Sequence, residues 1–178
     1  VHDVGIGRTP ETEKGLVFIV PDASTTNPST FLNDILIDNV NAYNTTHWQG
    51  IRVGRCGRKP TISCRNNDNR SGVTRASNAV VRNSTVHDTG GDGILVMQTN
   101  SSTVENNVVH DTGKATSSPD EWGWSPVGIW TWNCDGCTMQ ANEIYNAGSF
   151  NDRDGGGVDI DTLSQNSTAQ YNYAHDNQ

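Results

Sequence analysis

Two pairs of residues in this chain have types and spacing suited to cleaving a glycosidic bond. Asp159 and Asp161 stand two residues apart, and so do Trp130 and Trp132. In glycoside hydrolysis one carboxyl protonates the leaving oxygen, a second activates water or attacks, and aromatic rings hold the sugar face. Same-face residues of a strand lie about 6.6 Å apart at the backbone, which leaves inverting and retaining chemistry open. We predict catalytic aspartates and substrate-binding tryptophans; solvated aspartates on an exposed face are the alternative.

Two loops ahead of these pairs carry more residues of the same kinds. Residues 113–127 contain Trp122 and Trp124, which we also predict to bind substrate. Residues 148–156 contain Asp154, a third catalytic candidate. Long loops on one side of a repeat protein usually build its binding face. Simple loop packing is the alternative explanation for the tryptophans.

The elements that must position these residues are repeats around a short phrase, Val-His-Asp-x-Gly. Its copies begin at Val1, Val86 and Val109, and in looser form at Ala42, Ile144 and Ala174. The copies are unequally spaced. Unequal repeats around a constant phrase indicate a solenoid, in which the coil is constant and the loops vary in length.

Short alternating segments between the copies predict strands rather than helices, because glycine, asparagine and aspartate bound them. The recurring segments are 50–53, 93–96, 128–131 and 157–160. With the apolar residues turned inward, alternation produces two outward columns: Arg52, Leu95, Trp130 and Asp159, then Gly54, Met97, Trp132 and Asp161. Stacked coils lie about 4.8 Å apart, so the tryptophans and aspartates should share one surface. Arg52 thereby becomes a further substrate-binding candidate.

Asparagine and histidine recur at fixed positions of the repeat. Asn107, Asn142 and Asn172 each precede an inward apolar residue by two positions, and we predict that their side chains form a hydrogen-bonded ladder. The histidines recur in most copies, which favours a structural stack, because an active site needs a residue only once. If one histidine acts as a base, His110 is the best candidate, because its loop carries tryptophans.

The repeated Val-x-Asn-Asn-x-Val phrase, the asparagine ladder and the Gly-Ile-x-Val strands give the chain a family resemblance. It resembles the right-handed parallel β-helix proteins, a superfamily that includes pectate lyases, polygalacturonases and other polysaccharide-degrading enzymes. The resemblance covers nearly the whole chain. It implies an all-β fold, a right-handed parallel β-helix of about five coils with long loops on one face.

We expect residues 1–178 to form a single β-helix domain. The sequence starts and stops at the same phase of the repeat, with no evident cap at either end. Uncapped coils expose strand edges and core. We therefore expect an internal portion of a longer solenoid, or a segment that pairs with another.

The composition fits a narrow solenoid core and limits the partners. Of the 178 residues 33% are apolar and 18 are glycine, and the formal net charge is −8. This charge argues against nucleic-acid binding, and no stretch approaches the roughly 18 apolar residues of a membrane span. We expect a polysaccharide partner, no nucleic acid and no membrane. The basic residues gather in 52–75, as a solvated loop or as a patch for an anionic glycan.

The four cysteines form two local pairs, and we predict a disulfide in each: Cys56 with Cys64, and Cys134 with Cys137. Local disulfides suit an extracellular, secreted protein. Four glycosylation sequons, at Asn44, Asn83, Asn100 and Asn166, are compatible with a secreted glycoprotein. We predict no metal site and no certain cofactor. Calcium stays an alternative, because Asp152, Asp154, Asp159 and Asp161 offer oxygen ligands close in sequence.

The leading functional prediction is a secreted glycoside hydrolase that uses paired aspartates in a tryptophan-lined groove. The second is a polysaccharide lyase acting on a uronate-containing glycan, which needs a basic residue such as Arg52. The third is a non-catalytic, glycan-binding or adhesive β-helix. New reducing ends, an unsaturated uronate product, or neither would distinguish the three.

Overall fold

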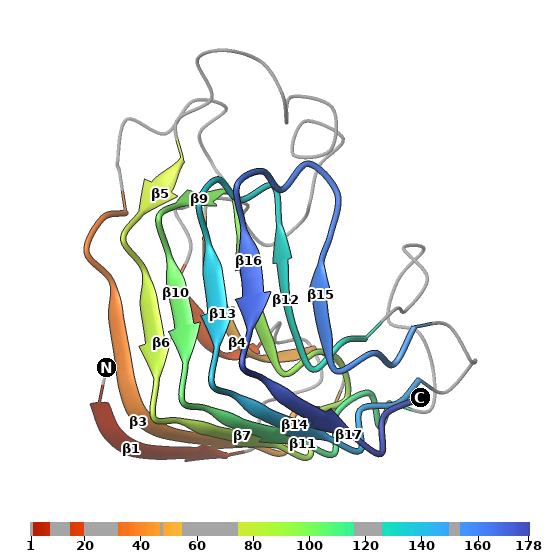
Figure 1. Ribbon diagram of the computed structural model, residues 1–178. Coiled ribbons are helices and arrows are strands. Elements are labelled where there is room, and N and C mark those ends of the chain that lie inside the picture. Colours follow the sequence, from red (N-terminus) through yellow and green to blue (C-terminus); the bar gives the residue numbers. More distant parts are fainter. Residues whose placement is uncertain are drawn as a thin grey trace.

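The computed structural model describes residues 2–7, 15–19, 32–46, 48–54, 75–115, 126–149 and 154–178. In these residues the chain forms strands and connecting turns and no helix. Every strand pairing is parallel, and equivalent strands of successive coils stack along one axis, from β1 to β17 (Figure 1). The predicted all-β parallel solenoid is confirmed.

Three sheets make up the described solenoid. The ten-stranded sheet contains β1 (His2–Gly7), β3 (Leu36–Tyr43), β6 (Val80–Arg82), β7 (Thr85–His87), β10 (Thr103–Glu105), β11 (Val108–His110), β13 (Thr138–Gln140), β14 (Glu143–Tyr145), β16 (Thr168–Gln170) and β17 (Tyr173–His175). The five-stranded sheet contains β2 (Gly15–Ile19), β4 (Gln49–Gly54), β8 (Ile94–Met97), β12 (Ile129–Trp132) and β15 (Val158–Ile160). A short pair consists of β5 (Ala76–Ser77) and β9 (Thr99–Asn100).

The long strand β3 joins two walls of the ten-stranded sheet. Its first residues pair with β6 and its last residues pair with β7. We call β6, β10, β13 and β16 the β6 wall, and β7, β11, β14 and β17 the β7 wall. These walls and the five-stranded sheet enclose the core.

In-register stacking builds this core from columns of equivalent residues. Ile51, Ile94 and Ile129 pair across β4, β8 and β12, and all three are fully buried. A second fully buried column lies under the β7 wall and consists of Val86, Val109 and Ile144, which pair in this order across β7, β11 and β14. Burying one such side chain stabilises the fold by about 1.5–3 kcal/mol. A chain that is 33% apolar can therefore fill the core, because nearly every coil contributes to every column.

The corners of each coil are formed by residues with positive φ, and most of them are asparagine or aspartate. Asp88, Asp111 and Asp176 end the His-Asp phrases with φ values of 51°, 54° and 53°. Asn44 and Asn146 hold the same place with 64° and 53°. Their short polar side chains make this left-handed conformation less costly than for other non-glycine residues. The aspartate of the repeated phrase is therefore a corner residue.

The predicted asparagine ladder is confirmed. The Asn107 side-chain amide donates to Asn142 Oδ1 at 3.0 Å, and the Asn142 amide donates to Asn172 Oδ1 at 2.9 Å. The same amides donate to backbone carbonyls inside the coil, at Val81 and Val104. Each rung thus satisfies polar groups of a buried turn, which would be costly to leave unpaired.

The histidines form the predicted structural stack on the outer face of the β7 wall. Tyr43, His87, His110, Tyr145 and His175 stack with ring centroids 5.3, 5.0, 4.7 and 5.1 Å apart. In each of the three histidines, Nδ1 lies 2.7–2.8 Å from a carboxylate oxygen of the aspartate that follows it. The repeated His-Asp phrase therefore supplies a stacked ring and a corner.

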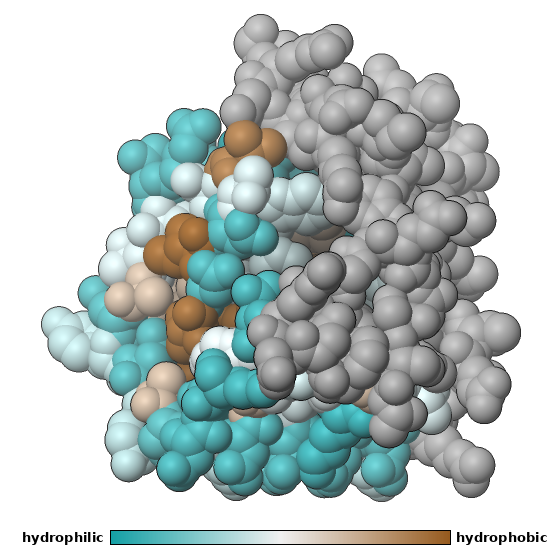
Figure 2. Space-filling view, turned by 90° about the vertical axis from the view of Figure 1, so that its right-hand side faces the viewer, coloured by the Kyte–Doolittle hydropathy of each residue, from teal (hydrophilic) through white to brown (hydrophobic). Residues whose placement is uncertain are grey.

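The strands β15, β16 and β17 form the last coil, and each pairs with a strand on one side only among the described residues. Ala169 and Ala174 hold inward positions but are exposed, and 38% of the Ile160 surface is exposed. Figure 2 looks onto this end and shows apolar side chains in brown among hydrophilic ones. Unpaired strand edges of this kind are open to pairing with another strand.

Replacing Asn142 by alanine should destabilise the fold by about 2–4 kcal/mol, because buried donors lose their acceptor. These donors are the backbone and side-chain amides of Asn107. Urea denaturation measures the free energy of unfolding. Asn172→Ala is the matched control at the more exposed end of the ladder and should cost about 1 kcal/mol. Equal losses for the two variants would contradict this role of the ladder.

Ala141→Gly should stabilise the protein. Ala141 has a φ of 52°, a conformation in which its Cβ costs about 1–2 kcal/mol. Glycine removes that cost and loses part of the gain through its greater freedom in the unfolded chain, so we expect a net gain of about 0.5–1 kcal/mol. The control is Ala147→Gly at a buried position without positive φ, which should destabilise. Thermal denaturation that shows a lower melting temperature for Ala141→Gly would refute the strain argument.

Candidate functional site

The five-stranded sheet places the predicted outward columns on one face. Parallel pairing aligns Arg52 with Leu95, Leu95 with Trp130, and Trp130 with Asp159. The second column aligns Gly54, Met97 and Trp132. Asp161 directly follows β15, and its backbone N–H donates to the Thr131 carbonyl at 2.9 Å. The structure therefore brings the pair Trp130 and Trp132 next to the pair Asp159 and Asp161, in adjacent coils.

Three aspartates interact electrostatically at the last coil of this face. Partial burial raises the pKa of Asp159, and the negative charges of Asp161 and Asp154 raise it further. The Asp161 carboxylate accepts hydrogen bonds from the backbone N–H of Thr162 at 2.5 Å and from its hydroxyl at 2.7 Å. The environments of Asp159 and Asp161 therefore differ. Two neighbouring carboxyl groups in different environments can take different roles, one as the acid and the other as the base.

Trp130 and Trp132 are half-buried and pack against Leu95 and Met97. Leu95 and Met97 also hold outward positions, yet only 3% and 1% of their surfaces are exposed. The outer face is thus closed at β8, half-open at the tryptophans of β12 and open at Asp159 of β15. The apolar contacts fix the indole rings next to the acidic coil.

Arg52 does not reach the surface, so the structure does not support its predicted role in binding substrate. Its side chain is 3% exposed, and Nη2 lies 3.0 Å from the sulfur of Met97. Burial lowers the pKa of Arg52 to about 10, and the charge of Asp92 partly opposes that effect. Alternation placed Arg52 correctly on the outer side, but alternation carries no information on what covers that side.

Asp92 is a site residue that the sequence prediction did not include. It is 5% exposed, and burial raises the pKa of its carboxyl to about 6. Gln49 Nε2 donates to it at 2.7 Å and the Val127 N–H at 3.0 Å. A signal was available, because Asp92 and Arg52 carry opposite charges, with Arg52 inside one strand segment and Asp92 just before the adjacent one. Strongly perturbed carboxyls of this kind are candidates for functional sites and also occur in structural networks.

The remaining predicted residues lie elsewhere. His110 belongs to the aromatic stack on the β7 wall, where Nδ1 contacts Asp111 at 2.7 Å, so the structure does not bring it to Asp159. Its predicted catalytic role is therefore not supported. Trp122, Trp124 and the pair Cys56 and Cys64 lie outside the described residues.

Cys134 and Cys137, which we predict to form a disulfide, are both buried free thiols in the structure. Both sulfur atoms lie within hydrogen-bond distance of the Thr99 hydroxyl, at 3.3 and 3.2 Å. The two cysteines share this hydrogen-bond partner, and the disulfide between them stays a prediction.

Groups that could hold a metal ion, with three or more histidine, cysteine or carboxylate side chains, do not occur in the part of the chain that the structure describes. Asp152, one of the four calcium candidates, lies outside it. Among the same residues, no helix is long and apolar enough to cross a membrane.

Comparison with known families agrees with this architecture. The sequence profile of the family described as the right handed beta helix region matches residues 24–178. The chain belongs to this right-handed β-helix family. A search of the curated proteins finds no match to the chain.

The variant Asp92→Asn tests whether burial of the Asp92 carboxyl makes the stability of the fold depend on pH. Because the pKa of Asp92 rises from 3.8 to about 6 on folding, the folded state binds this proton more tightly, and stability falls as the pH rises through this interval. Relative to Asp92→Asn, the wild type should lose up to about 3 kcal/mol of unfolding free energy between about pH 4 and pH 7. Urea denaturation at both pH values measures the difference. An unchanged difference would show that the carboxyl is not destabilised by burial.

Proposed function

We propose that this protein is a secreted glycoside hydrolase that cleaves a polysaccharide on the outer face of the five-stranded sheet. The observation that carries the proposal is the pairing of Trp130 with Asp159, whose pKa is raised beside Asp161 and Asp154. A raised pKa favours the protonated form that a general acid needs. Membership of the family establishes a β-helix protein. Because folds of this kind host many activities, the residues of the site, and not the fold, support hydrolysis.

Asp159 is the general acid in this proposal. Its proton passes to the glycosidic oxygen as the bond between that oxygen and the anomeric carbon breaks. Asp161 then activates a water molecule or attacks the anomeric carbon itself, and the elements of water are added across the cleaved bond. Asp154 tunes the site through its charge. The half-buried rings of Trp130 and Trp132 hold the sugar through stacking.

A polysaccharide lyase is the second candidate, because the lowered pKa of Arg52 makes its neutral, proton-accepting form more accessible than that of an ordinary arginine. A lyase base must reach the proton beside the uronate carboxyl. Arg52 is 3% exposed, which is why hydrolysis ranks first. A non-catalytic glycan-binding protein would need only the tryptophans.

The test starts with a panel of neutral and uronate-containing polysaccharides. New reducing ends without the ultraviolet absorbance of an unsaturated uronate identify a hydrolase, and that absorbance identifies a lyase. On a cleaved substrate, Asp159→Asn and Asp161→Asn should each lower kcat about 10²–10⁴-fold. Glu105→Gln is the matched control, because it makes the same change on the β6 wall, and it should retain full activity. Circular dichroism verifies that all variants are folded.

Two outcomes would overturn the proposal. Full turnover in both aspartate variants would remove Asp159 and Asp161 from the reaction. Binding to the panel without any cleavage would favour the glycan-binding protein, in which Trp130→Ala lowers affinity and Asp159→Asn does not.

A further inference from the structure

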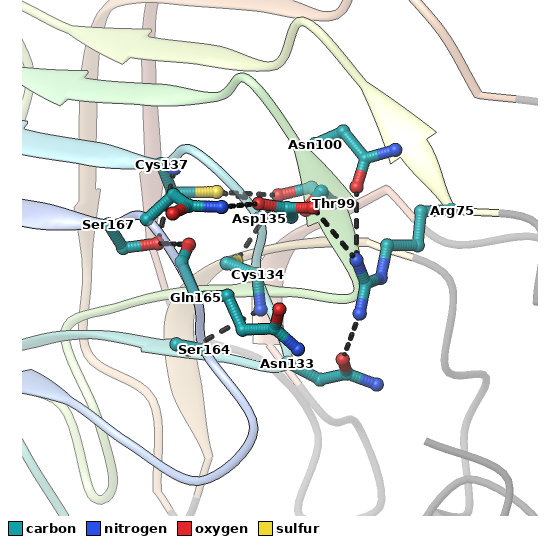
Figure 3. Close-up of polar contacts among 11 residues, drawn as sticks. Arg75, Thr99, Asn100, Asn133, Cys134, Asp135, Cys137, Ser164, Gln165 and Ser167 are labelled. Carbon is teal, nitrogen blue, oxygen red and sulfur yellow. Dashed lines mark hydrogen bonds and ion pairs between the residues drawn. The ribbon is translucent and has the colours of Figure 1, made fainter. Parts of the chain in front are cut away.

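The corner between β12 and β13 holds a pair of thiols that the proposed hydrolase does not use. Cys134 and Cys137 are 0% and 2% exposed, whereas Gly136 between them is exposed. Figure 3 shows the two cysteines and Asp135 next to Thr99, with Arg75 beyond them, 3.8 Å from the Asp135 carboxylate. The motif is Cys-x-x-Cys, a spacing that brings two sulfur atoms together in many redox proteins.

The two sulfur atoms share one hydroxyl. Thr99 Oγ1 lies 3.3 Å from the sulfur of Cys134 and 3.2 Å from that of Cys137. A hydrogen bond between the two cysteines lowers the pKa of the Cys137 thiol to about 7 and raises the pKa of the Cys134 thiol. The pair therefore has one thiol that ionises readily and one that holds its proton.

The backbone around the pair is fixed by the coils on both sides. The N–H groups of Cys134 and Cys137 donate to the hydroxyls of Ser164 and Ser167 in the next coil, at 3.3 and 3.2 Å. The backbone of Asp135 forms parallel β-bridges with Asn100 in the preceding coil and with Gln165 in the next coil. The sulfur atoms are thus held near each other by a scaffold that does not depend on a bond between them.

We propose that Cys134 and Cys137 are a redox-active dithiol that closes to a disulfide by exchange with a small-molecule disulfide such as oxidised glutathione. The Cys137 thiolate attacks one sulfur of glutathione disulfide, and the first glutathione leaves as a thiolate that takes up a proton. Cys134 then loses its proton and attacks the Cys137 sulfur of the mixed disulfide, which releases the second glutathione. The protein loses two electrons and two protons, and one glutathione disulfide becomes two glutathione thiols.

Burial of the pair shapes the kinetics of this exchange. Both thiols are shielded, so glutathione must wait for a local opening of the corner, and the exposed Gly136 marks where that opening begins. The rate of oxidation should therefore level off as the concentration of oxidised glutathione rises. An exposed dithiol would react in proportion to that concentration.

The experiment is peptide mapping of the folded protein after equilibration in glutathione buffers of increasing oxidation. After an acid quench and alkylation with N-ethylmaleimide, trypsin cleaves after Lys114 and Arg153, so residues 115–153 carry both thiols in one peptide. Cys56 and Cys64 fall in other peptides. In reducing buffers we expect this peptide to carry two N-ethylmaleimide groups. In oxidising buffers it should carry none and weigh two hydrogens less than the reduced, unalkylated peptide. Reduction with dithiothreitol should restore the alkylated form.

Single variants test the order of attack. Cys134→Ser should accumulate one glutathione on Cys137, because the resolving thiol is absent, whereas Cys137→Ser should leave Cys134 largely unmodified. The proposal is overturned if both thiols remain alkylated at every glutathione ratio while circular dichroism shows a folded protein. It is also overturned if the disulfide forms only in denaturant. Neither result bears on polysaccharide cleavage, so this proposal fails or stands separately from the proposed hydrolase.

Discussion

Parallel, in-register pairing between successive coils is the constraint on which the structure depends. It places equivalent residues of each repeat above one another, so that one buried isoleucine becomes the column Ile51, Ile94 and Ile129. The same pairing converts single asparagines into a ladder and single histidines into a ring stack. Corners at residues such as Asp88 and Asp111 keep the coil closed. Loops can vary in length without disturbing these columns, because the register resumes at the next strand.

The candidate site results from the same stacking. It lies where the residues of the outer column change from buried to exposed along the solenoid axis. One outer column runs from buried Arg52 and Leu95, through half-buried Trp130, to exposed Asp159. The change from a closed apolar surface to an open acidic one creates a boundary at which a sugar ring and two carboxyls can meet. Asp159 is partly desolvated there and close to like charges, and both effects favour its protonated form.

Alternation and repetition were sufficient to predict the fold and the alignment of the outward columns on the five-stranded sheet. The register of Trp130 and Asp159, the ladder of Asn107 and Asn142, and the histidine stack all follow from a period that the sequence displays. Burial of the outer face does not follow, because a repeat specifies the side on which a residue lies and not what covers it. The sequence therefore did not predict that Arg52 is buried, and the missed Asp92 acquires its raised pKa from burial on the same face. Whether two neighbouring thiols are bonded depends on redox conditions, which spacing alone does not encode.

The proposed mechanism depends most directly on the protonation of Asp159, which carbon-13 NMR of its side-chain carboxyl can follow as the pH is raised. It predicts that Asp159 titrates above the ordinary range for aspartate. In Asp154→Asn, the loss of a neighbouring negative charge should lower this pKa while leaving it raised by partial burial and by Asp161. An Asp159 that titrates at or below the ordinary value, or that is unchanged in the variant, would contradict the assignment of this carboxyl as the proton donor.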